Sequence, residues 1–303
     1  MIKVFCNIAD ALVDPLFEVF DGGDFILSSW RDVESPATEL RIYFPDASDA
    51  PAAIAALKAA GDVVGVRLAP EVSEIPDEDW KFAYRKHFKT DSISPRLAVV
   101  PEWEYEAWKS AHPSGSPQKA LILDPGMAFG TGQHATTRAC LEYVDELAVE
   151  DATRAFLDVG CGSGILAIAA ALEGFGDVSG FDVDPDAVEN ANENAARNGL
   201  SLTFTRGDLS RRSTLPGMCG AEGRTFGVVA ANVLGPVLIR FAPEISALVD
   251  RSPSSRLILS GILDEIYPDV AAAYAAQGFR EVSSRLVGEW RTGLFAPLPA
   301  DAR

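Results

Sequence analysis

The feature that most constrains the fold of this chain is a glycine-rich turn between two apolar stretches. Residues 156–164 read Phe-Leu-Asp-Val-Gly-Cys-Gly-Ser-Gly; an alanine-rich segment follows, and then a second apolar stretch that ends at Asp182. Strand, glycine turn, helix and strand in this order are typical of a nucleoside-binding unit. Glycines let backbone amides approach a ligand, and a helix start offers unpaired N–H donors. Asp182 is placed to accept hydrogen bonds from a ribose diol.

The glycine spacing indicates which nucleoside is bound. Gly160, Gly162 and Gly164 give GxGxG, whereas a dinucleotide fingerprint reads GxGxxG. The turn contains no Arg or Lys for a pyrophosphate, and Asp158 precedes it. A carboxylate there would repel a phosphate but suits a cationic, phosphate-free ligand such as S-adenosylmethionine, which counts against a nicotinamide dehydrogenase. Taken alone, the glycines also fit a plain strand-to-helix turn or a turn that has lost its ligand.

Composition excludes several classes of protein. The 303 residues are long enough for one large domain and a smaller one, and the longest apolar run, residues 164–172, is too short to span a bilayer. No basic segment opens the chain, and its four cysteines and three histidines show no metal-ligand spacing, so we expect a cytoplasmic protein with reduced thiols and no metal. A net charge of −18 disfavours nucleic acid and anionic membranes. It suits a basic partner, or it serves solubility alone.

The first 76 residues predict a small α+β, ferredoxin-like domain. Its expected strands cover residues 2–6, 25–30, 40–44 and 63–68, a turn covers 21–23, and its expected helices cover 12–20 and 52–60, the second closed by Gly61. We expect residues 77–118 to form a linker segment, since an acidic stretch with Pro76 precedes them.

Residues 119–303 alternate between strand and helix patterns, which predicts a parallel sheet covered on both faces. The expected strands cover residues 120–123, 155–159, 178–182, 202–206, 228–232, 257–260, 280–286 and 290–296. The expected helices cover residues 136–147, the segment from 164, and residues 186–198, 237–249 and 268–277.

Two further stretches stand beside strand ends, where open α/β sheets bind ligands. Residues 124–137 carry three glycines in seven residues and then His134 and two threonines, which indicates a loop that aims hydroxyls at a site or one that ends in a threonine helix cap. Asn232 ends an apolar strand, where its amide needs a partner in the crevice or from its own backbone. The Ser260–Gly261 end of the next strand would close the same crevice.

These motifs together resemble a known family. The chain carries LDPGMAFGTGQHATT, FLDVGCGSGILAIAA, GFDVDPDAVENANENAARNG, VVAANVLGPVL, LILSGIL and GEW in that order. The combination is similar to the methyltransferases that modify the eleventh protein of the large ribosomal subunit, closely over residues 121–295 and loosely upstream. GCGSG alone would indicate only some class I methyltransferase.

The resemblance implies a class I, Rossmann-like α/β domain with a seven-stranded sheet, a small N-terminal domain that grips the ribosomal protein, and S-adenosylmethionine as cofactor. It places cofactor contacts at these motif positions: Thr137, Gly160, Asp182 and Asn232, with Asp158 and Gly162 as adjuncts and Phe129 near the cofactor or target lysine. Gln133 departs from the family pattern, which puts substrate contacts in doubt. The weakly matched N-terminal region leaves the protein substrate less defined.

The expected reaction is methyl transfer to lysine side chains, and to N-terminal amines, of that basic ribosomal protein. A lysine has a reference pKa near ~10.4 and must lose a proton first, which burial beside a cationic sulfonium favours. Asn232 would position the amine, and His134 either accepts the proton or stabilises its loop. Alternatives are methylation of another protein, such as an electron-transfer flavoprotein subunit, and a cofactor-binding interaction subunit without catalysis.

Overall fold

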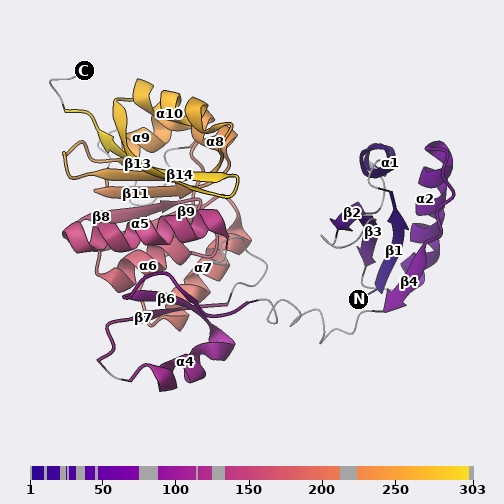
Figure 1. The fold of residues 1–303 in the computed structure, drawn as a ribbon, viewed down its shortest axis with the longest axis horizontal. Coiled ribbons are helices and arrows are strands. Elements are labelled where there is room, and N and C mark those ends of the chain that lie inside the picture. Colours follow the sequence, from indigo (N-terminus) through magenta and orange to yellow (C-terminus); the bar gives the residue numbers. More distant parts are fainter. Residues whose placement is uncertain are drawn as a thin grey trace. The chain divides into compact units, whose positions relative to one another are not determined.

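The computed structural model describes residues 2–9, 12–20, 25, 27–31, 38–44, 47–74, 88–113, 115–124, 134–211 and 224–299. The chain divides into two compact units, residues 1–87 and residues 88–303 (Figure 1). Within the part of the chain that is described, no helix is both long and apolar enough to cross a membrane.

The first unit is a four-stranded antiparallel sheet with two helices. Its strands are β1 (Ile2–Ile8), β2 (Leu27–Arg31), β3 (Thr38–Phe44) and β4 (Glu71–Glu74), in the order β2-β3-β1-β4. The helices are α1 (Val13–Phe20) and α2 (Ala50–Val63), the second preceded by the 3-10 turn η2 (Ala47–Asp49). Alternate residues of β1 and β3 are buried in one apolar core with Leu16 and Leu57 of the helices, as the two-residue period of a strand requires.

Two expectations for the first unit were wrong. Residues 63–68 form no strand: α2 runs to Val63, and β4 begins only at Glu71. Gly61 does not end the helix but lies inside it, where an added Cβ would stand 2.5 Å from the carbonyl oxygen of Val66. The glycine therefore serves close packing of the chain against α2. The turn predicted at residues 21–23 lies outside the described residues.

The second unit is built on a seven-stranded sheet in the order β10-β9-β8-β11-β12-β14-β13. The first five strands in that order are parallel, and β14 runs antiparallel to both neighbours. The strands are β8 (Ala155–Val159), β9 (Asp177–Asp182), β10 (Phe204–Arg206), β11 (Val228–Asn232), β12 (Arg256–Leu263), β13 (Phe279–Val287) and β14 (Trp290–Pro297).

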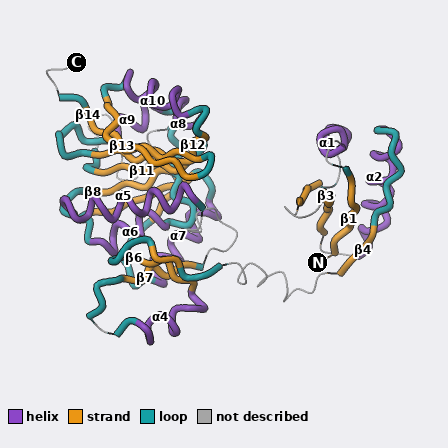
Figure 2. The backbone as a smooth tube through the Cα atoms, viewed as in Figure 1, coloured by secondary structure: helices purple, strands orange, loops and turns teal. Residues whose placement is uncertain are grey.

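Helices cover both faces of this sheet (Figures 1 and 2). One face carries α5 (Ala135–Asp151), α6 (Ile165–Glu173) and α7 (Pro185–Arg197); the other carries α8 (Gly235–Arg240), α9 (Ala242–Leu248) and α10 (Tyr267–Ala276). Successive residues of a strand face opposite sides of the sheet. Phe156 packs in the core under α5, α6 and α7, and Leu157 packs in the core under α8, α9 and α10. The helix predicted over residues 237–249 is two helices, broken at Phe241 before Pro243, which has no N–H to continue the first.

Residues 88–118 are not a linker, contrary to our expectation for 77–118. They form β5 (Asp91–Ser92), β6 (Leu97–Pro101), the 3-10 turn η4 (Glu102–Glu104) and α4 (Tyr105–Ala111), and the strand predicted at 120–123 is β7 (Lys119–Leu123). β5, β6 and β7 make a separate three-stranded sheet, in which β6 is wholly buried and parallel to β7. Burial of five consecutive residues ties this segment to the second unit. The boundary predicted at residue 76 lies outside the described residues.

Candidate cofactor site

The sheet order places a crevice at the carboxyl ends of two central strands. The chain leaves β8 toward β9 on one side and β11 toward β12 on the other, although β8 and β11 are neighbours. Open α/β sheets bind ligands where the strand order reverses in this way. The glycine turn follows β8 and Asn232 ends β11, so the topology brings both motifs to that point.

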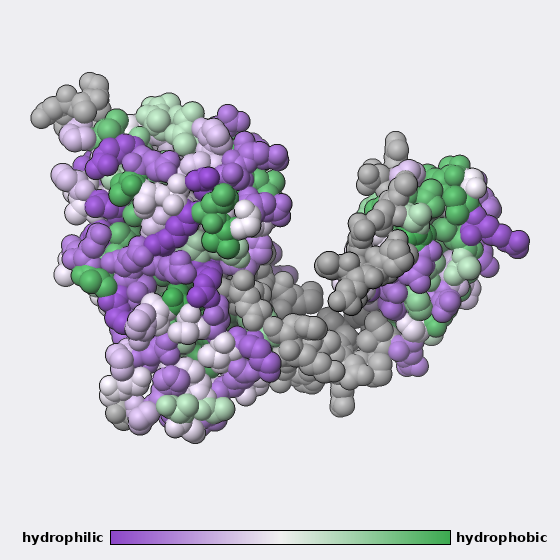
Figure 3. Space-filling model, viewed as in Figure 1, coloured by the Kyte–Doolittle hydropathy of each residue, from purple (hydrophilic) through white to green (hydrophobic). Residues whose placement is uncertain are grey.

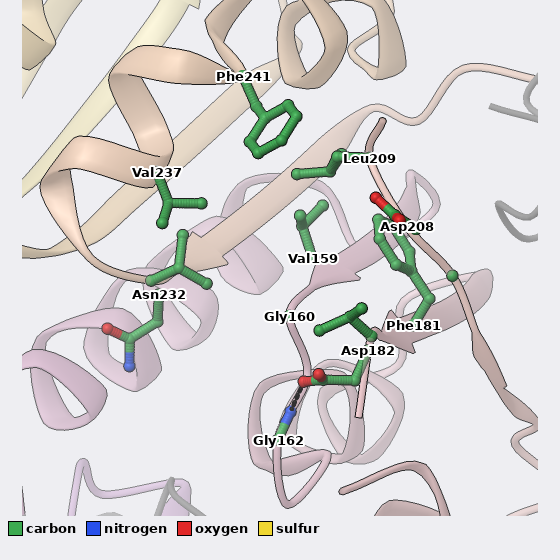
Figure 4. A pocket seen from close by; sticks show the side chains of 13 residues that line it. Val159, Gly160, Gly162, Phe181, Asp182, Asp208, Leu209, Asn232, Val237 and Phe241 are labelled. Atoms are coloured by element: carbon green, nitrogen blue, oxygen red, sulfur yellow. Dashed lines mark hydrogen bonds between the residues drawn. The ribbon is translucent and has the colours of Figure 1, made fainter. Parts of the chain in front are cut away.

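A cavity of about 410 Å³ opens there (Figure 4). It lies in the size range of small-molecule sites. Its lining combines the glycine turn, one acid at each of two strand ends and an apolar wall: Val159, Gly160, Gly162, Phe181, Asp182, Val183, Gly207, Asp208, Leu209, Asn232, Val233, Val237 and Phe241.

The glycine turn needs its glycines for both conformation and space. Gly160 has φ +68°, a left-handed value that side chains disfavour, and a Cβ added to it would stand 2.7 Å from Cγ1 of Val233. The amides of Gly160 and Cys161 both donate to the Phe181 carbonyl, at 3.0 Å. The turn is therefore fixed to β9, and its backbone lies open to the cavity.

Asp182 organises the turn and still faces the cavity. Its Oδ2 accepts the Gly162 N–H at 2.9 Å and its Oδ1 accepts the Asp184 N–H at 3.1 Å (Figure 4). A carboxylate offers about four lone-pair positions, so acceptor capacity remains on each oxygen. The arrangement suits a ligand with two adjacent hydroxyls.

Asn232 stands with half of its amide satisfied. Its Nδ2 donates to Oγ1 of Thr137 at 3.3 Å, whereas its buried Oδ1 has no hydrogen-bond partner among the described residues. A buried polar atom without a partner is costly unless a ligand or water supplies one. The orphaned oxygen therefore indicates a donor that arrives with a ligand.

A second cavity, of about 450 Å³, lies on the other side of Asn232. It is lined by His134, Thr136, Asn232, Val233, Leu234, Val237, Gly261 and Trp290. Asn232, Val233 and Val237 line both cavities, so they form the wall between them. The His134 and Trp290 rings meet edge to face with centroids 5.2 Å apart. A largely apolar chamber thus adjoins the first cavity.

His134 begins α5. Its Nδ1 lies 2.7 Å from Oγ1 of Thr136 and accepts the Thr136 N–H at 3.4 Å, so this histidine caps the helix, and the threonine cap that was one of the two interpretations of the loop is not formed. The loop-stabilising interpretation of His134 agrees with this geometry.

Asp158 is buried beneath the turn. It is 1% exposed, and its Oδ2 accepts the Ala167 N–H at 3.1 Å. Burial raises its pKa to about 7, the Ala167 hydrogen bond lowers it, and the nearby Asp182 charge raises it again. The folded protein therefore holds a proton here at pH values where the unfolded chain has lost it.

We expect Asp158→Asn to stabilise the ligand-free protein progressively as pH rises. Between pH ~4 and ~7 the folded state binds more protons than the unfolded state, so raising the pH costs the wild-type protein stability. The neutral, isosteric amide lacks this dependence. Urea midpoints of both proteins between pH 4.5 and 8 test this. Profiles that stay parallel would show that the carboxyl titrates normally.

Of the residues predicted from sequence, Gly160, Gly162, Asp182 and Asn232 line the cavity. Asp158 and Thr137 are buried and do not line the cavity. Asp158 accepts a hydrogen bond from Ala167, and Thr137 accepts one from Asn232. Phe129 and Gln133 lie outside the described residues. Sequence reasoning missed these lining residues of the two cavities: Asp208, Leu209, Val237, Phe241 and Trp290. The signal for Asp208 was its place two residues after the end of β10, at the same sheet edge as Asp182.

A mostly parallel sheet with a nucleoside-type crevice, whose glycine turn carries no basic side chain for a phosphate, is typical of a class I methyltransferase. Residues 24–295 match the family model for ribosomal protein L11 methyltransferase (PrmA), and the chain belongs to that family. It is 38% identical to the ribosomal protein L11 methyltransferase of Geobacter sulfurreducens, over 95% of this chain and 94% of the relative, and 37% identical to that of Geobacter metallireducens, over 97% of each. The crystal structure of ribosomal protein L11 methylase from Lactobacillus delbrueckii subsp. bulgaricus is 28% identical, with a TM-score of 0.56, covering 70% of this chain and 100% of that one.

The chain is accordingly an S-adenosylmethionine-dependent protein methyltransferase. The cavity fits this cofactor on two observations: a diol acceptor at Asp182 and a backbone cradle that a Cβ at Gly160 would fill. The glycine turn carries no basic side chain that could bind a phosphate. Its amides donate instead to the Asp182 carboxylate and to the Phe181 carbonyl.

Proposed function

We propose that this chain methylates lysine side chains and N-terminal amines of ribosomal protein L11. The observation that carries the proposal is the wall shared by the two cavities, with Asn232 at its centre. S-adenosylmethionine would supply a methyl group on a cationic sulfonium. The lone pair of an uncharged amine would attack the methyl carbon in line, the carbon–sulfur bond would break with S-adenosylhomocysteine as the leaving group, and the methylated ammonium would then lose a proton. One cavity would hold the cofactor and the other would admit the amine.

The second cavity is suited to an amine that must lose its proton. Its described lining carries no carboxylate, and its walls include Val233, Leu234 and Trp290. Such a lining disfavours the ammonium form and so lowers the pKa of an entering lysine. The orphaned Oδ1 of Asn232 would accept a hydrogen bond from the amine and orient its lone pair. His134 would keep α5 and the Trp290 ring in place.

The other site residues take supporting roles in this proposal. Asp182 would bind the ribose, and Gly160 and Gly162 would present backbone to the cofactor. Asp158, an acid kept buried at a cost to stability, would favour the cofactor's positive charge. Thr137 would fix the Asn232 amide, and Phe129 would pack near the cofactor or target amine.

We also propose the finer architecture. The antiparallel β2-β3-β1-β4 order with helices after β1 and β3 supports a ferredoxin-like first unit, and the seven-stranded second unit supports catalysis. A boundary near residue 76 and a cytoplasmic location with the ribosomal substrate complete the proposal.

The first unit offers a surface for the protein substrate. Val19 and Phe20 of α1 and Ala52, Ala56 and Ala59 of α2 line an apolar groove of about 380 Å³ (Figure 3). Residues 1–74 contain 13 acidic and 5 basic residues. An apolar groove in an acidic unit is complementary to a basic protein, which electrostatic attraction would steer to it. We therefore assign the groove to the L11 substrate.

Intact-mass spectrometry of purified L11, incubated with this enzyme and S-adenosylmethionine, tests the proposal. We expect a series of one-methyl steps. In the same assay Ala59→Glu, in the groove, should raise the KM for L11 about tenfold, which corresponds to ~1.4 kcal/mol. Ala47→Glu, at an exposed position of the 3-10 turn η2 that does not line the groove, is the matched control and should leave the KM unchanged.

The outcomes separate the alternatives. Unmodified L11 with cofactor still bound would point to another protein substrate. Cofactor binding without transfer to any basic protein would leave an interaction subunit. Equal effects of the two glutamates would remove the groove from substrate binding.

A further inference from the structure

The amide side chains of α7 hold the end of β7 where a neighbouring strand is missing. Among the described strands, β7 pairs only with β6, so its other edge needs partners. Asn198, which caps α7, accepts the Ile122 N–H at 2.8 Å and donates to the Ile122 carbonyl at 2.7 Å. Asn194 accepts the Asp124 N–H at 3.3 Å. The two side chains thus take the place of a neighbouring strand and bind the backbone groups at the unpaired edge of β7.

The spacing of the two asparagines matches the strand. Ile122 and Asp124 are two residues apart, ~6.6 Å along a strand. Asn194 and Asn198 are four residues apart, ~6 Å along a helix. Helix and strand therefore stay in register over this contact, with α7 running opposite to β7.

Asn194 also reaches the glycine turn. It is fully buried, and its Nδ2 donates to the Ser163 carbonyl at 3.0 Å and to Asn190 Oδ1 at 3.1 Å. Ser163 lies between Gly162, whose N–H binds Asp182, and Gly164, where an added Cβ would meet Phe204 at 2.9 Å. One amide thus joins the turn to Asp124, the residue from which the chain enters the segment leading to His134 and Thr137.

We propose that Asn194 is a positioning residue for the cofactor site, which links the glycine turn to the end of β7. It fixes the Ser163 carbonyl and, through the turn, the direction of the Gly162 N–H. The Asn198 side chain binds β7 and the Asn194 carbonyl of its own helix but not the glycine turn. The proposal rests on the cofactor site of the proposed function and assigns to it a supporting residue that contacts both the glycine turn and Asp124.

Calorimetric titration with S-adenosylhomocysteine tests the proposal with two matched variants. Asn194→Asp keeps the acceptor for Asp124 but replaces the donor to Ser163 with an oxygen that repels its carbonyl. Asn198→Asp removes the equivalent donor to Ile122. We expect the Kd to rise at least about tenfold for Asn194→Asp and to stay within about twofold for Asn198→Asp, with lowered melting temperatures in both.

Equal Kd changes in the two variants would overturn the proposal, since the amides would then serve stability alone. A wild-type protein that bound no S-adenosylhomocysteine would instead remove the cofactor site itself. Wild-type hydrogen exchange gives a measurement that needs no variant. We expect added S-adenosylhomocysteine to slow exchange of the Asp124 amide more than that of Ile122; the same change at both would also overturn the link.

Discussion

Replacing Asp182 with alanine should weaken cofactor binding by at least about 100-fold. Hydrogen bonds to a charged group contribute ~1.5–3 kcal/mol each, and the carboxylate would accept two from the ribose. The same change frees the Gly162 N–H, whose direction Asp182 holds at 2.9 Å. The measurement is equilibrium binding of S-adenosylhomocysteine by calorimetry.

A control acid stands at the other end of the same strand. Asp177 begins β9, has a side chain that is 61% exposed, and pairs with Arg224 away from the cavity. Asp177→Ala should leave the Kd within about twofold, because the free energy of an exposed ion pair is small. If Asp182→Ala and Asp177→Ala weakened cofactor binding equally, the loss of affinity would come from a disturbance of β9 and not from a lost contact with the ribose diol.

The motifs that carry the glycine turn were predictable because they are local. The turn, β8 and β11 follow from short apolar runs and glycines, and the predicted bounds of both strands match the structure. Asp182 and Asn232 could be placed at one crevice because parallel strands bring their carboxyl ends to a common edge.

Contacts between distant segments could not be read in this way. The pattern of Leu97–Pro101 is as apolar as that of a central strand, yet it belongs to the separate three-stranded sheet. The apolar run at residues 63–68 resembles a strand. In the structure, however, α2 continues past Gly61 to Val63, because the chain at Val66 and Leu68 packs closely against Gly61. The Thr137 hydroxyl accepts a hydrogen bond from the Asn232 amide, a pairing across 95 residues that local motifs do not indicate, and the expected contact of Thr137 with the cofactor stays a prediction.

Replacing Asn232 with alanine should lower kcat about 100-fold while changing the Kd for S-adenosylhomocysteine less than tenfold. Loss of one preorganised group at a reacting centre typically costs a factor of ~10²–10³ in kcat. Asn232 lies in the wall between the two cavities, and its Oδ1 has no partner in the part of the chain that is described, so its main use would come when an amine is present. Single-turnover methylation of L11 and calorimetry give the two values.

Ser260 on β12 is the matched control, since it pairs with Asn232 in the sheet register. Its hydroxyl is buried, donates to the Thr136 carbonyl at 3.2 Å and lies 2.6 Å from Oγ1 of Thr292. Ser260→Ala should cost ~1 kcal/mol of stability and leave kcat within about threefold. Should Asn232→Ala weaken only cofactor binding and spare kcat, Asn232 would be a cofactor contact, and the amine would have to be oriented by the backbone and by the aromatic wall of the second cavity. A fall in kcat for Asn232→Ala alone, at nearly constant affinity, would place the asparagine at the transferred methyl group, because the two substitutions remove polar groups from paired positions of adjacent strands.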